Sequence, residues 1–160
     1  MTAVTGLIPA RFLTMIAHLV ISITLFWTTD ESVSACLPID YTPEMFDDKK
    51  TQLTVALSLT VIFLAGELIG FMFGISMFIH LQGLLCNFLT VNICQFYHCH
   101  LVFRLATCCH TSGAVATAFF MFESWPCYLY WYIWGFCSLL PFLTEIGVVL
   151  FVFVIRKTLL

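Results

Sequence analysis

Four long runs of apolar residues alternate with shorter polar stretches along the chain. The runs cover about residues 7–27, 53–78, 105–122 and 129–155. Each has roughly the 20 residues that an α-helix needs to cross the ~30 Å hydrocarbon core of a bilayer. The pattern therefore predicts an all-α, polytopic membrane protein with a single four-helix transmembrane bundle over residues 1–160.

The polar stretches predict the connections between these helices. Residues 28–52 hold eight of the fifteen formal charges together with Pro38 and Pro43, so we expect an irregular outer loop there. Residues 79–104 mix apolar residues with several amides and histidines. We expect an extra helical or re-entrant segment on the cytosolic side here, and a fifth span is the alternative.

The composition indicates that much of the protein surface faces lipid. The chain is 61% hydrophobic and 9% charged, with a mean hydropathy of +1.03, whereas a soluble domain carries about 25% charged residues. We expect the first run to be a retained helix, because Asp30 and Glu31 separate it from the small residues that resemble a signal-peptide cleavage site. The net charge of −3 indicates no nucleic-acid partner.

The basic residues predict the orientation in the membrane. Arg11, Arg104, Arg156 and Lys157 flank the apolar runs on one side, whereas residues 28–52 contain six acids. Lysine and arginine near helix ends are retained in the cytosol. Both termini are therefore predicted to be cytosolic.

Three ionisable residues lie inside apolar runs: His18, Glu67 and Glu145. Counted at ~1.5 Å per residue from the predicted cytosolic ends, all three lie about 10–16 Å deep. We predict that they face the bundle interior as one polar cluster, because such groups are costly in lipid. The cluster is interpreted either as a lock on the helix register or as an ion path. The lack of repeated halves and broken helices favours the lock.

Small residues recur at four-residue intervals on two of the predicted helices. They are Gly66, Gly70 and Gly74, and Ala114 and Ala118. Small side chains let helix backbones approach closely in lipid. We predict helix-packing contacts at these positions, Gly70 in particular, within the bundle or alternatively across a dimer interface.

Cys36 and Cys127 are the two cysteines, among eight, that fall in the predicted outer regions. These regions face an oxidising compartment, so a disulfide between them is predicted. Two free thiols too far apart to join are the alternative.

A second group of thiols and imidazoles lies in the middle of the chain. Its members are Cys94, His98, Cys99, His100, Cys108, Cys109 and His110. The group lacks the paired short spacing of zinc ligands, and no phosphate loop or nucleophile elbow occurs. We therefore expect no metal, no cofactor and no enzymatic activity.

Four stretches carry a family resemblance: GLIPARFLTMIAHLVISITLFW, ACLPIDYTPEMFD, GELIGFMFGISMF and FFMFESWPCYLYWYIWGFCSLLPFLTE. In order and content they resemble the transmembrane protein 107 family of tetraspan ciliary proteins. The resemblance covers residues 6–78 and 106–155. It departs at residues 79–105, where we expect extra residues relative to the family, from an alternative transcript or a gene-model error.

The resemblance implies a structural and interaction component of the ciliary transition zone. The implied partners are membrane lipids and other membrane and scaffold proteins of the Meckel-syndrome complex. The implied role is in cilium assembly, in the diffusion barrier of the ciliary membrane and in Hedgehog signalling, without catalytic or cofactor residues. A small channel or transporter subunit using His18, Glu67 and Glu145 is the alternative function.

The predicted topology is tested by epitope tags at the two ends of the chain. Both tags should be inaccessible to antibody in intact cells and accessible after permeabilisation, because basic flanks stay in the cytosol. Tags on opposite sides of the membrane would contradict this topology and favour five spans.

Overall fold

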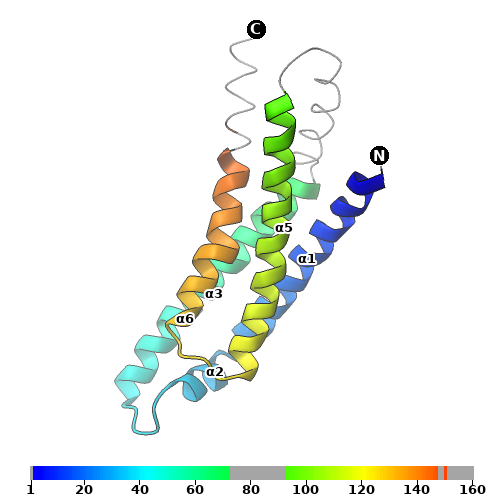
Figure 1. Cartoon of the computed structure of the whole chain (residues 1–160). Helices are drawn as coiled ribbons and strands as arrows, with labels where there is room; N and C mark the ends of the chain where they lie inside the picture. The colour runs from blue at the N-terminus through cyan, green and yellow to red at the C-terminus, as the bar shows by residue number, and fades with distance from the viewer. Residues whose placement is uncertain (1, 73–92, 148–149, 151–160) are drawn as a thin grey trace.

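The computed structural model describes residues 2–72, 93–147 and 150, and these residues are helical with short connections. Four rods run side by side: α1 (Thr2–Trp27), α3 (Pro43–Met72), α5 (Ile93–Phe122) and a last helix that begins as α6 (Leu129–Trp134) (Figure 1). α1 packs against both α5 and α3. The predicted all-α membrane fold is confirmed.

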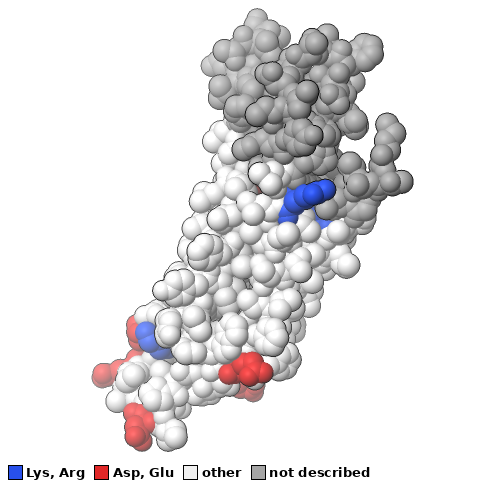
Figure 2. Space-filling model, viewed as in Figure 1, with Lys and Arg blue, Asp and Glu red and all other residues white. Residues whose placement is uncertain are grey.

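Three of the described helices are long and apolar enough to cross a membrane: Pro9–Trp27, Pro43–Met72 and Arg104–Phe122. The last helix continues from α6 through residues 135–147. Acidic side chains gather at the end formed by α2 and the start of α3, whereas the visible flank of the bundle is almost uncharged (Figure 2). The uncharged flank is the surface that suits the hydrocarbon of a bilayer.

The beginning of α1 and the residue-147 end of the last helix lie at the same end of the bundle (Figure 1). A contact between Arg11 and Glu145 joins the two helices there. Cys36 and Cys127 meet at the opposite end. Because both cysteines lie at one end, the chain between them makes an even number of crossings, which α3 and α5 supply.

The prediction of an irregular outer loop over residues 28–52 is wrong. The segment contains α2 (Thr29–Cys36), and α3 already begins at Pro43. The Thr42 hydroxyl accepts a hydrogen bond from the Met45 amide (3.3 Å), as an N-cap does. Proline fits the first helical position, where no N–H is required, and Glu44 favours the positive end of the helix dipole. The irregular connection is therefore short.

The start of the third long helix also differs from the prediction. α5 begins at Ile93, whereas the apolar run suggested residue 105. The predicted extra segment at 79–104 thus includes the first turns of a single continuous helix. Its first part, residues 79–92, and the predicted end of the second helix at residues 73–78 lie outside the described residues, as do residues 151–155 of the fourth.

The last helix leaves α-helical geometry at Gly135–Leu139, which form a π-helical turn. The Leu140 amide bonds to the Gly135 carbonyl, five residues back. Pro141 explains this turn, because its ring carries no N–H and crowds the carbonyl four residues earlier in an α-helix. The wider turn relieves that crowding, and Cys137 and Ser138 in it are buried toward the bundle.

The apolar core fills the end of the bundle opposite to Arg11. Its buried members include Leu25 on α1, Val33 on α2, Leu57 on α3 and Phe120 on α5. The Phe120 ring meets the Tyr130 ring edge to face, with centroids 5.5 Å apart. This packing fixes the short α2 underneath the long helices.

A disulfide joins Cys36, the last residue of α2, to Cys127 in the connection between α5 and α6, with a Cα–Cα distance of 5.6 Å. An ion pair of 2.6 Å between Lys50 and Asp30 also holds α2 to α3. Both partners are largely exposed, so the ion pair adds little stability. The disulfide is therefore the strong link at this end.

Removing the disulfide with Cys36→Ser should lower the free energy of unfolding. A closed loop of 91 residues restricts the unfolded chain by about 4–5 kcal/mol in the chain-entropy model. Thermal unfolding in detergent, paired with thiol labelling before and after reduction, measures both the bond and its effect. Cys108→Ser, at an exposed free cysteine, is the matched control and should leave stability unchanged. Labelling of Cys36 and Cys127 without reductant would contradict the prediction.

Candidate functional site

Two buried ionisable side chains from different helices form the centre of the site. Glu67 of α3 is 3% exposed and His110 of α5 is fully buried. The Oε2 atom of Glu67 lies 2.8 Å from Nε2 of His110. A buried carboxylate needs such a partner, because its desolvation is otherwise costly. The pair therefore joins α3 to α5 inside the bundle.

Arg11 of α1 brings a permanent positive charge to the same place. Its Nη2 atom lies 2.7 Å from Oε1 of Glu145 and 4.0 Å from Oε2 of Glu67. Only 4% of Arg11 is exposed. A guanidinium carries five N–H donors in a rigid fork, so it can contact two carboxylates at once. Arg11 thus links α1 to α3 and to the last helix.

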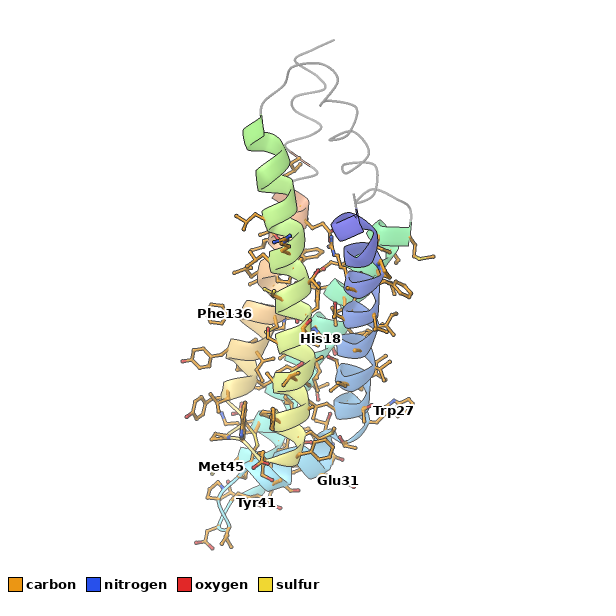
Figure 3. All side chains as sticks on the ribbon, turned by 45° about the vertical axis from the view of Figure 1, so that its right-hand side comes forward. His18, Trp27, Glu31, Tyr41, Met45 and Phe136 are labelled. Carbon is orange, nitrogen blue, oxygen red and sulfur yellow. A yellow bond between two sulfur atoms is a disulfide. The ribbon has the colours of Figure 1, made fainter. Side chains whose placement is uncertain are left out.

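His18 lies next to this charged group, in the interior between α1 and α5 (Figure 3). Its ring is fully buried, and the ring centroids of His18 and His110 are 6.0 Å apart. A Cβ atom added to Gly113 would lie 2.5 Å from Cε1 of His18 and 2.8 Å from Cβ of Cys137. The imidazole therefore fits only because α5 has no side chain at position 113.

Further polar groups continue from His18 toward the disulfide end. The hydroxyls of Ser22 on α1 and Thr117 on α5 each follow one helical turn after His18 and Gly113, and both side chains are fully buried. Beyond them, Thr60 and Tyr130 share a hydrogen bond of 3.2 Å. The apolar core then closes the end of the bundle.

Glu67 and Glu145 meet through Arg11, whereas His18 lies beside the His110 ring and its ring nitrogens make no hydrogen bond with the described residues. The cluster also contains two residues that the sequence analysis missed, Arg11 and His110. Arg11 was interpreted as a flank of the membrane, yet it is buried, so it no longer counts among the flanking residues that support the predicted orientation. His110 was considered only with the neighbouring cysteines. Both carried a usable signal: Arg11 precedes His18 by two helical turns, and His110 is an ionisable residue in an apolar run.

The predicted small-residue contacts are only partly present among the described residues. A Cβ on Gly66 would lie 3.8 Å from the Phe142 ring, which is ordinary contact, but one on Gly70 would meet nothing within 4 Å. No described atom lies close to that position on Gly70, so a helix contact there stays a prediction, and Gly74 lies outside the described residues. Gly113 is the closely packed glycine instead.

The two predicted alanines lie on the face of α5 toward α1. Ala114 is 7% exposed and Ala118 is half-buried. Both line a groove beside Ile21 of α1. They therefore shape a surface between two helices of the bundle.

Among the described residues, no three His, Cys, Asp or Glu side chains converge on one point that could hold a metal ion. Cys108 is exposed, Cys109 half-buried and Cys137 buried. The side chains of residues 94–100 lie outside the description.

Comparison with known proteins identifies close relatives over nearly the whole chain. The family model TMEM107, described as a transmembrane protein, matches residues 7–149. Transmembrane protein 107 of Homo sapiens is 43% identical over 157 residues, 98% of each chain. The Xenopus laevis protein of that name is 43% identical over 96% of this chain and 95% of its own length. The Danio rerio protein is 41% identical over 94% of this chain and 96% of its own.

These alignments correct one expectation. The alignment with the human protein covers 98% of each chain, so the two proteins have nearly the same length. Residues 79–105 are therefore not an insertion with respect to the human protein. The proposal of an alternative transcript or gene-model error loses its basis. No solved structure matches this chain.

Gly113→Ala should destabilise the bundle, because the new methyl group would overlap the His18 ring and the Cys137 Cβ atom. Overpacking of this kind costs about 1–3 kcal/mol. Gly70→Ala is the matched control: it meets no atom within 4 Å among the described residues, and alanine favours a helix over glycine by up to about 1 kcal/mol. Thermal unfolding in detergent should give a lower Tm for the first variant only. Equal Tm values would contradict the assigned role of Gly113.

Proposed function

The chain belongs to the transmembrane protein 107 family, and we propose that it is a structural and interaction component of the ciliary transition zone. In this role it supports cilium assembly, the diffusion barrier of the ciliary membrane and Hedgehog signalling. Its proposed partners are other membrane and scaffold proteins of the Meckel-syndrome complex. The observation that carries the proposal is the near full-length match to transmembrane protein 107.

The internal pairing of the buried charges supports a structural role. Arg11, Glu67 and Glu145 are held within one cluster, with His110 as a further partner of Glu67. A carboxylate that is already paired with a cationic or hydrogen-bonding side chain gains little free energy by binding a passing ion. The paired charges instead penalise any rotation of a helix that would separate the partners. We therefore interpret the cluster as a lock on helix register.

The apolar core argues against a path through the bundle. From the charged cluster, buried polar side chains continue to Thr60 and Tyr130 in the described part of the chain, and Leu25, Leu57 and Phe120 fill the space beyond, each at most 2% exposed. An ion would have to cross this layer without a polar ligand. A channel or transporter subunit using His18, Glu67 and Glu145 is therefore the weaker proposal.

An apolar tip at the disulfide end offers a surface for partners. Ile39 is completely exposed, and Tyr41 and Met45 are exposed by 40% and 42%. They belong to the connection between α2 and α3 and to the first turn of α3, at the acidic end of the bundle (Figures 2 and 3). Exposed apolar groups that lie among charged side chains, beyond the uncharged flank of the bundle, are typical of protein contacts. We assign the partner contact to this tip.

Localisation and rescue test the proposal. In ciliated cells lacking the endogenous relative, a tagged copy should concentrate at the base of the cilium and restore cilium number. The double variant Ile39→Ser/Tyr41→Ser should insert normally but recover fewer partners on purification, because it removes apolar contact area. Ser34→Ala, an exposed change on α2, is the control. Diffuse membrane localisation of the wild-type chain would contradict the proposal.

Ion flux in proteoliposomes separates the two functions. The wild-type protein should conduct no more than empty liposomes, since the apolar core closes one end of the bundle. A flux that disappears with Glu67→Gln would overturn the structural proposal and establish the channel.

A further inference from the structure

A groove of about 320 Å³ opens between α1 and α5 on the outer surface of the bundle. It is lined by Ile21 of α1, by Ala114, Val115, Ala118, Phe119 and Phe122 of α5, and by Glu123 directly after α5. The end of α5 and Glu123 lie toward the disulfide end of the bundle. The lining is apolar except for Glu123. The groove therefore lies where membrane lipid reaches it and carries one charge at one end.

The length of the groove matches one leaflet of a bilayer. From Ala114 to Glu123 the chain advances nine residues, or about 13.5 Å at ~1.5 Å per residue. Half of the ~30 Å hydrocarbon core is about 15 Å. A lipid chain lying in the groove would therefore have its headgroup beside Glu123.

Three features at the Glu123 end attract a cation. Glu123 is exposed and makes no ion pair with another described residue. It follows directly after the C-terminus of α5 at Phe122, where the helix dipole is negative. The Phe119 ring, which lines the groove, stacks on Trp125 with centroids 6.3 Å apart, and aromatic faces bind quaternary ammonium groups.

We propose that this groove is a binding site for a lipid with a phosphocholine headgroup. One acyl chain lies over Ala114 and Ala118, and the quaternary ammonium lies between the Glu123 carboxylate and the Phe119–Trp125 pair. A lipid with an anionic headgroup is disfavoured by the same carboxylate. The site does not depend on the ciliary role proposed above.

The shape of the groove favours a lipid chain over a transmembrane helix. Val115, Phe119 and Phe122 stand out beside the alanines, with 51%, 50% and 78% exposure. Such side chains hold a second helix backbone away from Ala114 and Ala118, whereas close backbone approach is what small residues offer a helix partner. A flexible acyl chain can enter between them.

Photo-crosslinking tests the site. The purified chain is reconstituted in nanodiscs with a phosphatidylcholine that carries a diazirine in its acyl chain, and adducts are mapped by mass spectrometry. We expect adducts to concentrate on Ile21 and residues 114–122. Unlabelled phosphatidylcholine should compete better than phosphatidylglycerol.

Two variants probe the two halves of the site. Ala118→Phe should fill the groove and remove most adducts, whereas Ile62→Phe, on the exposed face of α3, should not. Glu123→Gln should lower the preference for phosphatidylcholine by up to about fivefold, the effect of losing one exposed ion pair. Glu31→Gln, an exposed acid on α2, is its control. Because Glu123 is exposed, its variant remains informative if Ala118→Phe fails to fold.

Several results would overturn the proposal. Adducts spread evenly over α1, α3 and α5 would show ordinary annular lipid only. Equal competition by phosphatidylglycerol would remove the role of Glu123, and better competition by phosphatidylethanolamine would remove the aromatic contact to a quaternary ammonium. Adducts between two copies of the chain at Ala118 would assign the groove to a helix partner.

Discussion

The constraint on which this bundle depends is the neutralisation of charge inside a medium that cannot solvate it. Arg11, Glu67 and Glu145 come from three different helices, and His110 on a fourth completes the set. A charge left alone there would cost several kcal/mol, roughly. Each helix must therefore keep both its rotation and its depth for the others to be satisfied. Apolar packing against lipid tails, which are themselves apolar, provides no comparable restriction.

Different interactions hold the two ends of the bundle together. At the end with Arg11, hydrogen-bonded charges define which faces meet. At the other end, the disulfide and the cluster around Leu25, Leu57 and Phe120 hold α2 beneath the long helices. Gly113 lies between these regions, where the absence of a side chain lets the His18 ring enter α5's surface. In one half of the bundle, polar contacts therefore determine which helix faces meet. In the other half, apolar packing and the disulfide hold the helices together.

The sequence predicts the helical membrane class because hydrophobic length is a local property. It also indicates that Glu67 and Glu145 lie at a similar depth, since depth can be counted along each helix, and Arg11 contacts both of them. Contacts that depend on the position of a side chain on another helix could not be predicted from the sequence. Gly70 and Gly113 look alike as residues, and only the position of the His18 ring distinguishes them. The start of α3 was missed for another reason: Pro43 suggested a loop, although Thr42 and Glu44 on either side form a regular helix beginning.

The bond between Cys36 and Cys127 has a consequence for biosynthesis. The two thiols lie 91 residues apart in sequence, with α3 and α5 between them. They can meet only after both of these helices have been inserted and the connection before α6 has reached the same compartment as α2. A chain with one helix left out or inverted would present its thiols on opposite sides of the membrane. The oxidised state of this pair therefore reports that the helices between the two cysteines have been inserted in the correct order and direction.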